Sequence, residues 1–394
     1  MQDAATALLV FIPFPSDTEY AIARYVQTFF EAGRVFTGDA ARVHFAYTRI
    51  VPGRSSRLPL DAGNLFEFDP GSPASVARAV QRIEAAGISA FLGLDVPTEG
   101  FPFAALRRAG VRSIVAYYGA PISDLNRGVK LWLKRLEMRL RPSLPDHYIF
   151  ESEAMRRTAV EGRGIPTDAT SVVYLGVDPE RFTPARARAF HAHDLFGIPR
   201  ERSIVFYSGH METRKGVDVI VRAALDLVVR RGRKDVQFLL AGNRDGEEQR
   251  FLGLLRGTPA EDHVRFIGYR DDLPDIEAAC HIGVIASTGW DSLTYSAIEM
   301  AASGLPIVVS RLQGLVETVE EGRTGFLFRP GDPVELSDRI EQLLESPRLR
   351  AEMGARARER VLGAFTHDHQ VRGLAAVLAR THGLERAAHP VLQR

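Results

Sequence analysis

Short apolar runs without polar alternation recur from one end of the chain to the other, and amphipathic helical patterns separate nearly all of them. Two clear examples are residues 204–207, Ile-Val-Phe-Tyr, and residues 238–241, Phe-Leu-Leu-Ala. A strand that is apolar at every position is covered on both faces, which is typical of a parallel sheet lying between helices. The chain is therefore expected to be an α/β protein built from doubly wound sheets.

The apolar runs predict two successive sets of strands. In the first half the strands are expected at residues 7–12, 43–47, 65–68, 90–94, 113–118, 147–150 and 171–175. In the second half they are expected at residues 203–207, 236–241, 264–267, 282–286, 307–310 and 325–328. After Asp332 only helical patterns remain, at residues 334–345, 348–365 and 367–381.

The length of 394 residues exceeds what one hydrophobic core usually serves and suits two domains of about 150–200 residues each. The boundary is expected within residues 182–202, where Pro184, Gly197 and Pro199 interrupt an Arg/Ala/His-rich stretch. We therefore place a first domain at residues 1–185 and a second at residues 186–365.

Composition excludes several classes of protein. The net charge of +1 argues against a nucleic-acid binder, and no apolar run approaches the ~18 residues of a membrane span. Cys280 is the only cysteine, so no internal disulfide can form and a reducing compartment is expected. The first residues carry an acid and no basic segment, and their short apolar run ends at Pro13. We therefore expect a first strand rather than a signal peptide, and a cytoplasmic protein.

The turn after the first strand of the second domain is Tyr-Ser-Gly-His-Met-Glu-Thr-Arg-Lys-Gly, residues 207–216. Gly209 permits a tight turn, and Arg214 and Lys215 come just before the next helical pattern. Two cations at a helix N-terminus suit a diphosphate. Neither a P-loop nor a G-x-G-x-x-G motif occurs, which weakens a dinucleotide interpretation. The alternative is that both cations are solvated loop charges.

A second strand-to-helix turn holds two acids eight positions apart, Asp291 and Glu299. The N–H groups of Ser292, Leu293 and Thr294 are expected at the start of the helix, where they can bind phosphate oxygens. Carboxylates before and within the helix can accept hydrogen bonds from ligand hydroxyls, as a ribose requires. The pattern favours an extended ligand such as a nucleotide sugar. Alternatively, Asp291 is a plain N-cap and Glu299 is a polar residue on a helix face.

Together these motifs resemble the donor domain of retaining family 4 glycosyltransferases, which have the GT-B fold. The resemblance covers roughly residues 146–365. Its main elements are Asp291-x7-Glu299, Gly304-Leu-Pro306, Gly314-Leu-Val-Glu317 and Gly322-Arg-Thr-Gly325. Further similarities are a phosphate loop from Gly209 to Gly216, a Leu175-Gly-Val-Asp178 motif closing the first domain, and a base-side strand and turn from Val264 to Gly268.

The resemblance implies two Rossmann-like domains facing across a cleft. The first would bind the acceptor and receive a C-terminal helix from residues 366–394, and the second would bind the nucleotide-sugar donor. Asp291 would bind hydroxyls of the transferred sugar, and Glu299 would bind the ribose. Lys215 and Arg214 would neutralise the departing diphosphate, without a metal or cofactor. The other donor-binding positions would be Gly209, His210, Ser292, Leu293, Thr294, Gly268 and Tyr269.

Four features depart from the family pattern. Asp291 stands where a Glu is usual, and His210 stands where an Arg usually follows the glycine of the phosphate loop. A Gly-Gly loop after the first strand is replaced by Pro-Phe-Pro-Ser-Asp-Thr-Glu-Tyr, which includes Asp17. Tyr118 replaces a His that serves the sugar. Tyr118 and Asp17 are candidates for the acceptor or sugar side, and the alternative for Tyr118 is an aromatic residue lining the cleft.

Residues 127–141 predict an amphipathic helix. One face holds Val129, Trp132, Leu133, Leu136 and Leu140, and the other holds Arg127, Lys130, Lys134 and Arg141 together with Glu137. The first interpretation is an internal helix with a solvated basic side. The second is docking on an anionic membrane surface, which would place the protein peripherally at the inner face of the membrane, where lipid-linked acceptors lie.

The implied function is transfer of a hexose-type sugar from a nucleotide sugar to a hydroxyl of a sugar or lipid-linked acceptor. The pathway would be synthesis of bacterial cell-envelope polysaccharide or lipid-linked oligosaccharide. Two other functions stay open. The departures at Tyr118, His210 and the missing glycine loop suggest a non-catalytic nucleotide-sugar-binding subunit. A sugar-nucleotide epimerase with this fold would need acids and a histidine placed for proton abstraction, and no such set is evident in the first domain.

Overall fold

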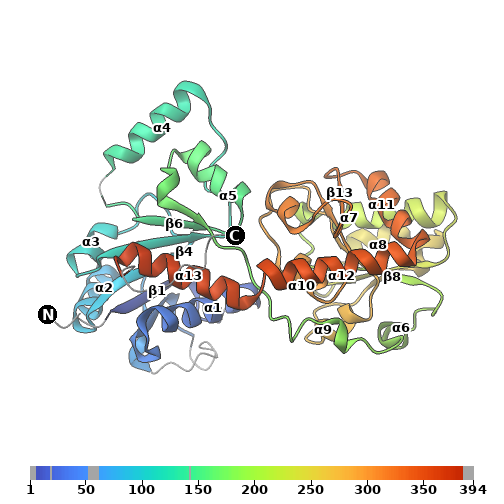
Figure 1. Ribbon diagram of the computed structural model, residues 1–394, viewed down its shortest axis with the longest axis horizontal. Coiled ribbons are helices and arrows are strands. Elements are labelled where there is room, and N and C mark those ends of the chain that lie inside the picture. The colour runs from blue at the N-terminus through green and yellow to red at the C-terminus, as the bar shows by residue number, and fades with distance from the viewer. Residues whose placement is uncertain (1–5, 18–19, 52–61, 142, 385–394) are drawn as a thin grey trace. The chain divides into compact units, whose positions relative to one another are not determined.

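The computed structural model describes residues 6–17, 20–51, 62–141 and 143–384 (Figure 1). The chain divides into two compact units. Unit 1 consists of Met1–Val173 together with Asp368–Arg394, and unit 2 consists of Tyr174–His367. Each unit contains one parallel sheet with helices on its faces, as the apolar runs predict.

Unit 1 has a seven-stranded parallel sheet in the order β3-β2-β1-β4-β5-β6-β7. The order reverses between β1 and β4, which makes the ends of these two strands the topological switch point. The strands are β1 (Ala7–Pro15), β2 (Val43–Arg49), β3 (Leu65–Glu67), β4 (Ile88–Leu94), β5 (Ser113–Tyr118), β6 (His147–Phe150) and β7 (Thr170–Val172).

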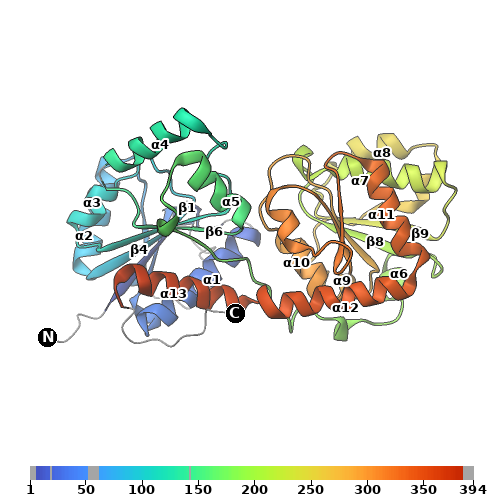
Figure 2. The same ribbon diagram turned by 45° about the horizontal axis from the view of Figure 1, so that its top comes forward.

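Helices cover both faces of the unit 1 sheet (Figure 2). Phe29 of α1 and Leu374 of α13 pack on one face, and Ile83 of α2 and Leu106 of α3 pack on the other. The C-terminal helix is thus part of unit 1, although unit 2 precedes it in the sequence. The helices are α1 (Tyr20–Thr37), α2 (Pro73–Ala85), α3 (Phe103–Arg108), α4 (Gly128–Leu140), α5 (Glu153–Arg157), α13 (His367–His382) and the short η1 (Ala40–Arg42), η2 (Ala62–Asn64), η3 (Thr158–Arg163) and η4 (Thr167–Ala169).

Unit 2 has a six-stranded parallel sheet in the order β10-β9-β8-β11-β12-β13. Its strands are β8 (Ser203–Ser208), β9 (Val236–Ala241), β10 (Val264–Phe266), β11 (Ile282–Ile285), β12 (Ile307–Ser310) and β13 (Gly325–Phe328). Its helices are α6 (His191–Phe196), α7 (Val217–Leu225), α8 (Gln249–Leu255), α9 (Leu273–Ala278), α10 (Tyr295–Ala302), α11 (Pro333–Glu345) and α12 (Pro347–Ala364). Shorter turns are η5 (Pro184–Arg186), η6 (Thr213–Lys215), η7 (Asp226–Arg230), η8 (Pro259–His263) and η9 (Gln313–Thr318).

Each strand expected from the sequence is present, with small differences at the ends. The largest differences are at β1, which ends at Pro15 rather than at residue 12, and at β7, which ends at Val172 rather than at residue 175. The residues that follow already pack within unit 2, where the Tyr174 hydroxyl donates to Glu317 (3.1 Å) and the Val177 N–H donates to the Phe365 carbonyl (2.9 Å).

The contact boundary between the units, at 173/174, therefore lies before the predicted division at 185/186. The proline-containing stretch that suggested the later boundary is a surface segment of unit 2. Its Arg186 forms a bidentate pair with Asp275 of α9, at 3.1 and 2.9 Å. Proline and glycine mark where a strand or helix stops, and they do not show which sheet the following segment packs on.

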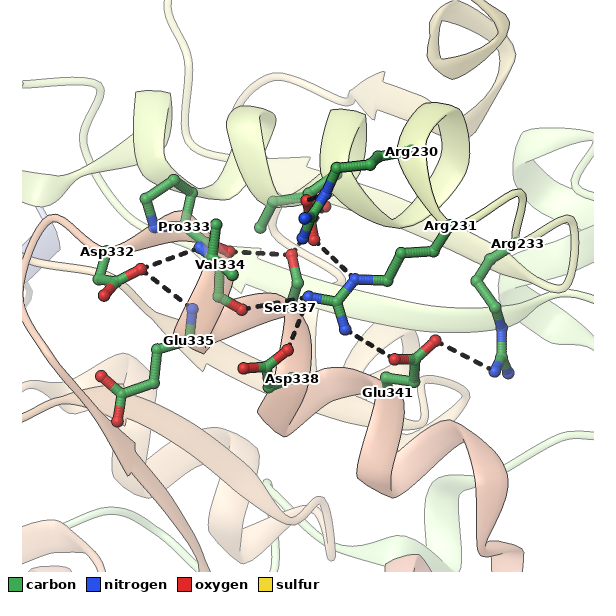
Figure 3. Close-up of polar contacts among 12 residues, drawn as sticks. Arg230, Arg231, Arg233, Asp332, Pro333, Val334, Glu335, Ser337, Asp338 and Glu341 are labelled. Atoms are coloured by element: carbon green, nitrogen blue, oxygen red, sulfur yellow. Dashed lines mark hydrogen bonds and ion pairs between the residues drawn. The ribbon is translucent and has the colours of Figure 1, made fainter.

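A network of ion pairs joins the end of η7 to α11 (Figure 3). The Arg231 guanidinium donates to Asp226 (2.8 Å), Asp338 (2.6 Å) and Glu341 (2.7 Å). The Arg231 side chain is 18% exposed, whereas Arg230, which pairs with the same Asp226, is 61% exposed. Because Arg231 is partly buried and binds three carboxylates, its ion pairs are expected to contribute measurably to the free energy of unfolding.

We expect Arg231→Leu to lower the free energy of unfolding of unit 2 by about 2–3 kcal/mol, because Asp226 and Glu341 lose their shared cation in a partly buried place. Arg230→Leu should cost less than about 1 kcal/mol, since an exposed pair is screened by water. Urea titrations of the two variants test this directly. Equal losses would show that the network does not depend on Arg231.

Candidate functional site

The two turns singled out in the sequence lie side by side in unit 2. The strand order of this sheet reverses between β8 and β11. The Gly209–Lys215 segment follows β8, and the Ser287–Thr294 segment follows β11. Ligands of open parallel sheets bind beyond the carboxyl ends of the strands at such a switch point. The two turns therefore lie at the edge where this class of sheet binds ligands.

Gly216 brings the two segments into direct contact. Its φ angle is 67°, and a Cβ atom placed on it would lie 1.8 Å from the Ala286 carbonyl oxygen. The neighbouring Arg214 carbonyl accepts a hydrogen bond from the Thr288 N–H (2.7 Å). Only glycine combines this left-handed backbone with so close an approach. The backbone itself thus fixes the spacing between the two turns.

Lys215 and Asp291 meet across these turns. The Lys215 Nζ lies 2.9 Å from the Asp291 Oδ2, which also accepts a hydrogen bond from the Ser287 hydroxyl (2.6 Å). The Asp291 N–H donates to the Gln313 Oε1 (3.0 Å). Side-chain exposure is 18% for Lys215 and 6% for Asp291. The structure thus joins two predicted residues into one largely buried ion pair that Ser287 and Gln313 hold in place.

The helix after Asp291 begins later than the sequence suggested. Thr294 is the N-cap, and its hydroxyl accepts a hydrogen bond from the Ala297 N–H (3.3 Å). Asp291 is therefore not the N-cap of this helix. Its carboxylate is instead bound by Lys215 and Ser287, and the cap position is taken by Thr294, three residues further along the chain.

Ser292, Leu293 and Thr294 consequently precede the helix instead of forming its first turn. Within the described residues, none of their backbone N–H groups has a hydrogen-bond acceptor. The Ser292 hydroxyl is buried and likewise has no partner among them. Buried polar groups are normally satisfied, so groups without a partner mark a place where a ligand or water binds.

Arg214 and His210 lie in more open surroundings. The Arg214 guanidinium stacks on the Trp290 ring (4.3 Å to the centroid), and its Nε donates to Glu212 (2.7 Å). His210 is 55% exposed, and its Nδ1 lies 3.6 Å from the same carboxylate. Burial disfavours the Glu212 carboxylate, but Arg214, His210 and Lys215 together hold its pKa below the usual value. The Glu212 carboxylate thus neutralises part of the positive charge of this loop.

Glu299 and the Gly268–Tyr269 turn complete the predicted set. Glu299 lies one turn into α10 and is 1% exposed. The Gly268 N–H donates to the Asn243 Oδ1 (2.8 Å), and the Gly268 carbonyl accepts from Gly242 (2.8 Å). Tyr269 is 53% exposed. These two hydrogen bonds join the turn after β10 to the residues that follow β9. The Gly209 N–H donates to the carbonyl of Ala241, the last residue of β9 (3.1 Å).

Sequence reasoning missed Ser287, Asn243 and Gln313. Each follows a strand of unit 2 within a few residues, and Ser287 and Asn243 are buried polar side chains. The available signal was a polar residue just beyond an apolar run, at the edge of the sheet where the other candidates lie. That signal is weak, because many strands end in this way.

The two candidates in unit 1 have different surroundings. Tyr118 is 5% exposed, its hydroxyl donates to the Val96 carbonyl (2.6 Å), and its ring stacks on Phe150. Asp17 is exposed in the turn after β1. Within the described residues the structure shows no hydrogen bond between them. It instead places a buried carboxylate, Glu151, at the end of β6, where it accepts a hydrogen bond from the Tyr117 hydroxyl (3.3 Å).

We expect Gly216→Ala to lower the free energy of unfolding by at least ~3 kcal/mol, since the new methyl group cannot fit against the Ala286 carbonyl. Gly232→Ala is the matched control, because Gly232 has a similar φ of 70° and its new methyl group would have nothing within 4 Å. It should cost only the ~1–2 kcal/mol of a left-handed alanine. Urea unfolding measures both, and equal losses would rule out the backbone contact.

Comparison with known proteins finds a family pattern that matches most of unit 2. The sequence pattern of "Glycosyl transferases group 1" matches residues 202–346. The D-inositol 3-phosphate glycosyltransferase of Corynebacterium diphtheriae is 29% identical over 198 residues, which are 49% of this chain and 46% of that protein. The chain thus matches about half the length of these curated relatives.

Solved structures resemble nearly the whole chain. A glycosyltransferase from Rickettsia africae has a TM-score of 0.79 at 14% identity, covering 98% of this chain and 100% of that one. HepE from Anabaena, solved in complex with UDP, has a TM-score of 0.74 at 17% identity, covering 95% and 100%. At such identities the likeness shows the fold, and it confirms two Rossmann-like units. Residues 202–346 thus match the sequence pattern of glycosyl transferases group 1, and the chain has the GT-B fold.

Proposed function

We propose that the chain is a retaining glycosyltransferase that moves a hexose-type sugar from a nucleotide-sugar donor to a hydroxyl group of an acceptor. The observation that carries this proposal is the cluster at the switch point of unit 2. There Lys215 and Arg214 stand beside the Ser292–Thr294 segment, whose N–H groups have no acceptor among the described residues. The match of residues 202–346 to the glycosyl transferases group 1 pattern and the UDP bound to HepE support the same interpretation of the site.

The reaction that this cluster suits is departure of a nucleoside diphosphate. Charge builds up on the diphosphate as its bond to the sugar breaks, and fixed cations and N–H groups stabilise that charge without reorganising. The Lys215 ammonium is already held by Asp291 at 2.9 Å. Arg214 is held by stacking on Trp290 and by its contact with the Trp290 carbonyl (3.3 Å). Both cations are thus oriented before a donor binds, and we infer that no metal is needed.

The two carboxylates have separate proposed roles. Asp291 accepts hydrogen bonds from hydroxyls of the transferred sugar, using the carboxylate oxygen that neither Lys215 nor Ser287 contacts. Glu299, buried in α10, binds the ribose of the nucleotide. The half-exposed Tyr269 ring after β10 lies beside the base. We infer retention of configuration, with the acceptor hydroxyl attacking from the side on which the diphosphate leaves.

The proposal for the acceptor site names fewer residues than the proposal for the donor site. We assign the acceptor to unit 1 and propose a sugar or lipid-linked hydroxyl in cell-envelope glycan synthesis on the cytoplasmic side of the membrane. Tyr118 has no role in this proposal, because its hydroxyl already donates to Val96. Asp17, exposed after β1, stays a candidate.

A thermal-shift panel of UDP, GDP, dTDP, ADP and their sugars tests the donor site. A nucleotide at ~100 times its dissociation constant should stabilise the chain by about 2.7 kcal/mol. We expect the shift with one base only, and we expect Lys215→Met and Glu299→Gln to abolish it. Lys234→Met, at an exposed lysine, and Glu277→Gln, at another buried glutamate, are the matched controls and should keep it. The absence of a shift with every nucleotide would overturn the proposal.

Incubation with the donor identified in that panel separates the alternative functions. Sugar transfer to added acceptors, with slow donor hydrolysis in their absence, supports a transferase. Donor binding without hydrolysis or transfer would indicate a non-catalytic binding subunit. Conversion of the donor to a different sugar nucleotide without an acceptor would indicate an epimerase.

A further inference from the structure

Helix α4 of unit 1 exposes a continuous row of large apolar side chains. We call Val129, Trp132, Leu133, Leu136 and Leu140 the α4 stripe; their exposed fractions are 75%, 60%, 53%, 38% and 73%. Their spacing of three and four residues puts them on one side of the helix, over a length of about 20 Å. Contiguous apolar surface of this kind is rare on a protein that contacts only water.

The stripe is not needed to hold α4 on unit 1. The opposite side of the helix makes the contacts, with Met138 buried and with Gly164 against the backbone of Arg135. This inner side also borders a cavity of about 390 Å³, so apolar packing beneath the helix is incomplete. The α4 stripe therefore points away from the apolar contacts that anchor the helix.

Ion pairs supply the rest of the attachment. Arg163, whose side chain is 8% exposed, binds Glu137 of α4 (3.1 Å) and Glu99 (2.6 Å). Arg141 binds the same Glu99 (2.9 Å) and also pairs with Glu137. Lys134 adds a third cation to Glu137 (3.0 Å). Because these pairs and Met138 fix the helix, the α4 stripe is free to contact another surface.

The charges around the stripe have one sign. Residues 127–141 contain six Lys or Arg and one acid, Glu137, which is already paired. Lys130, Arg135 and Arg139 are exposed and have no ion pair within the described residues. On a helical projection Lys130 lies on one flank of the stripe, and Arg135 and Arg139 lie on the other. The apolar row is thus bordered on both sides by positive charge.

We propose that α4 lies flat on a phospholipid bilayer that carries anionic headgroups, with the α4 stripe in the apolar boundary and the flanking cations among the headgroups. Trp and Leu on one face with Lys and Arg beside them is the pattern of helices that lie in this interface. A second copy of the chain would bring like charges against like charges, which disfavours self-association through this face. In the part of the chain that the structure describes, no helix is long and apolar enough to cross a bilayer, so the contact is peripheral.

Vesicle co-sedimentation of the full chain tests the proposal. We expect binding to vesicles with about a third phosphatidylglycerol, and binding at least ~10-fold weaker to pure phosphatidylcholine, as several interfacial cations require. Raising the salt concentration should weaken the first interaction. The assay uses no nucleotide, so its outcome is independent of the proposed donor site.

Two pairs of variants locate the surface. Leu133→Ser with Leu136→Ser should reduce binding to anionic vesicles at least ~10-fold, because each leucine buries several methylene groups in the interface. Its control is Leu195→Ser with Leu362→Ser, the same change at two leucines of unit 2 that are each 44% exposed. Lys130→Glu with Arg139→Glu should reduce binding at least ~20-fold, given about 1 kcal/mol per cation. Its control is Arg78→Glu with Arg108→Glu, at exposed arginines of α2 and α3.

The controls should bind like the unchanged chain, and circular dichroism should show that every variant is folded. Three results would overturn the proposal. They are failure of the unchanged chain to bind anionic vesicles, equal binding by the Leu133/Leu136 variant, or a dimer in solution that the Leu133/Leu136 variant converts to a monomer. The last result would assign the stripe to a second copy of the chain.

Discussion

The contact of Gly216 with the Ala286 carbonyl is the constraint on which the candidate site of unit 2 depends. A side chain at this position would separate the loops after β8 and β11. With glycine there, the Arg214 carbonyl reaches Thr288 and the Lys215 ammonium reaches Asp291, 76 residues further along the chain. Once Asp291 is bound by Lys215 and Ser287, Thr294 caps the helix, and residues 292–294 keep N–H groups that no described residue accepts. The absence of a side chain at Gly216 thus determines the position of the N–H groups of residues 292–294, which have no acceptor among the described residues.

Much of the fold could be predicted because its signal is local. Runs such as Val236–Ala241 and Ile307–Ser310 are apolar throughout or nearly so and have the bounds that the sequence indicated. The two turns of the candidate site were also found from the sequence, because the residues of each lie close together in it. The contacts between the two turns could not be predicted, since no local pattern indicates that the loop after β8 contacts the loop after β11. The pairing of Lys215 with Asp291 is a property of the strand order.

The start of α10 shows how a tertiary contact changes a local preference. Asp291, Ser292 and Thr294 are all suitable N-cap residues, and the sequence alone favoured a helix start at Asp291. The carboxylate of Asp291 is drawn to a cation from another loop, so the hydroxyl of Thr294 takes the cap. Helix α4 shows the same limit. Its amphipathic pattern was evident, but only its contacts in the fold, the buried Met138 and the ion pairs of Arg163 with Glu99 and Glu137, show which side of the helix faces unit 1.

The return of α13 to unit 1 has a consequence for how the protein is made. Leu374, Val377 and Leu378 of this helix pack in the same core as Phe29 and Tyr117. A ribosome synthesises all of unit 2 before it reaches these residues. During that time the sheet of unit 1 lacks one of the two helices that cover this face, and apolar side chains stay exposed. The unit that is made first is therefore the last to finish folding, and a fragment that ends at Val173 would keep an open core.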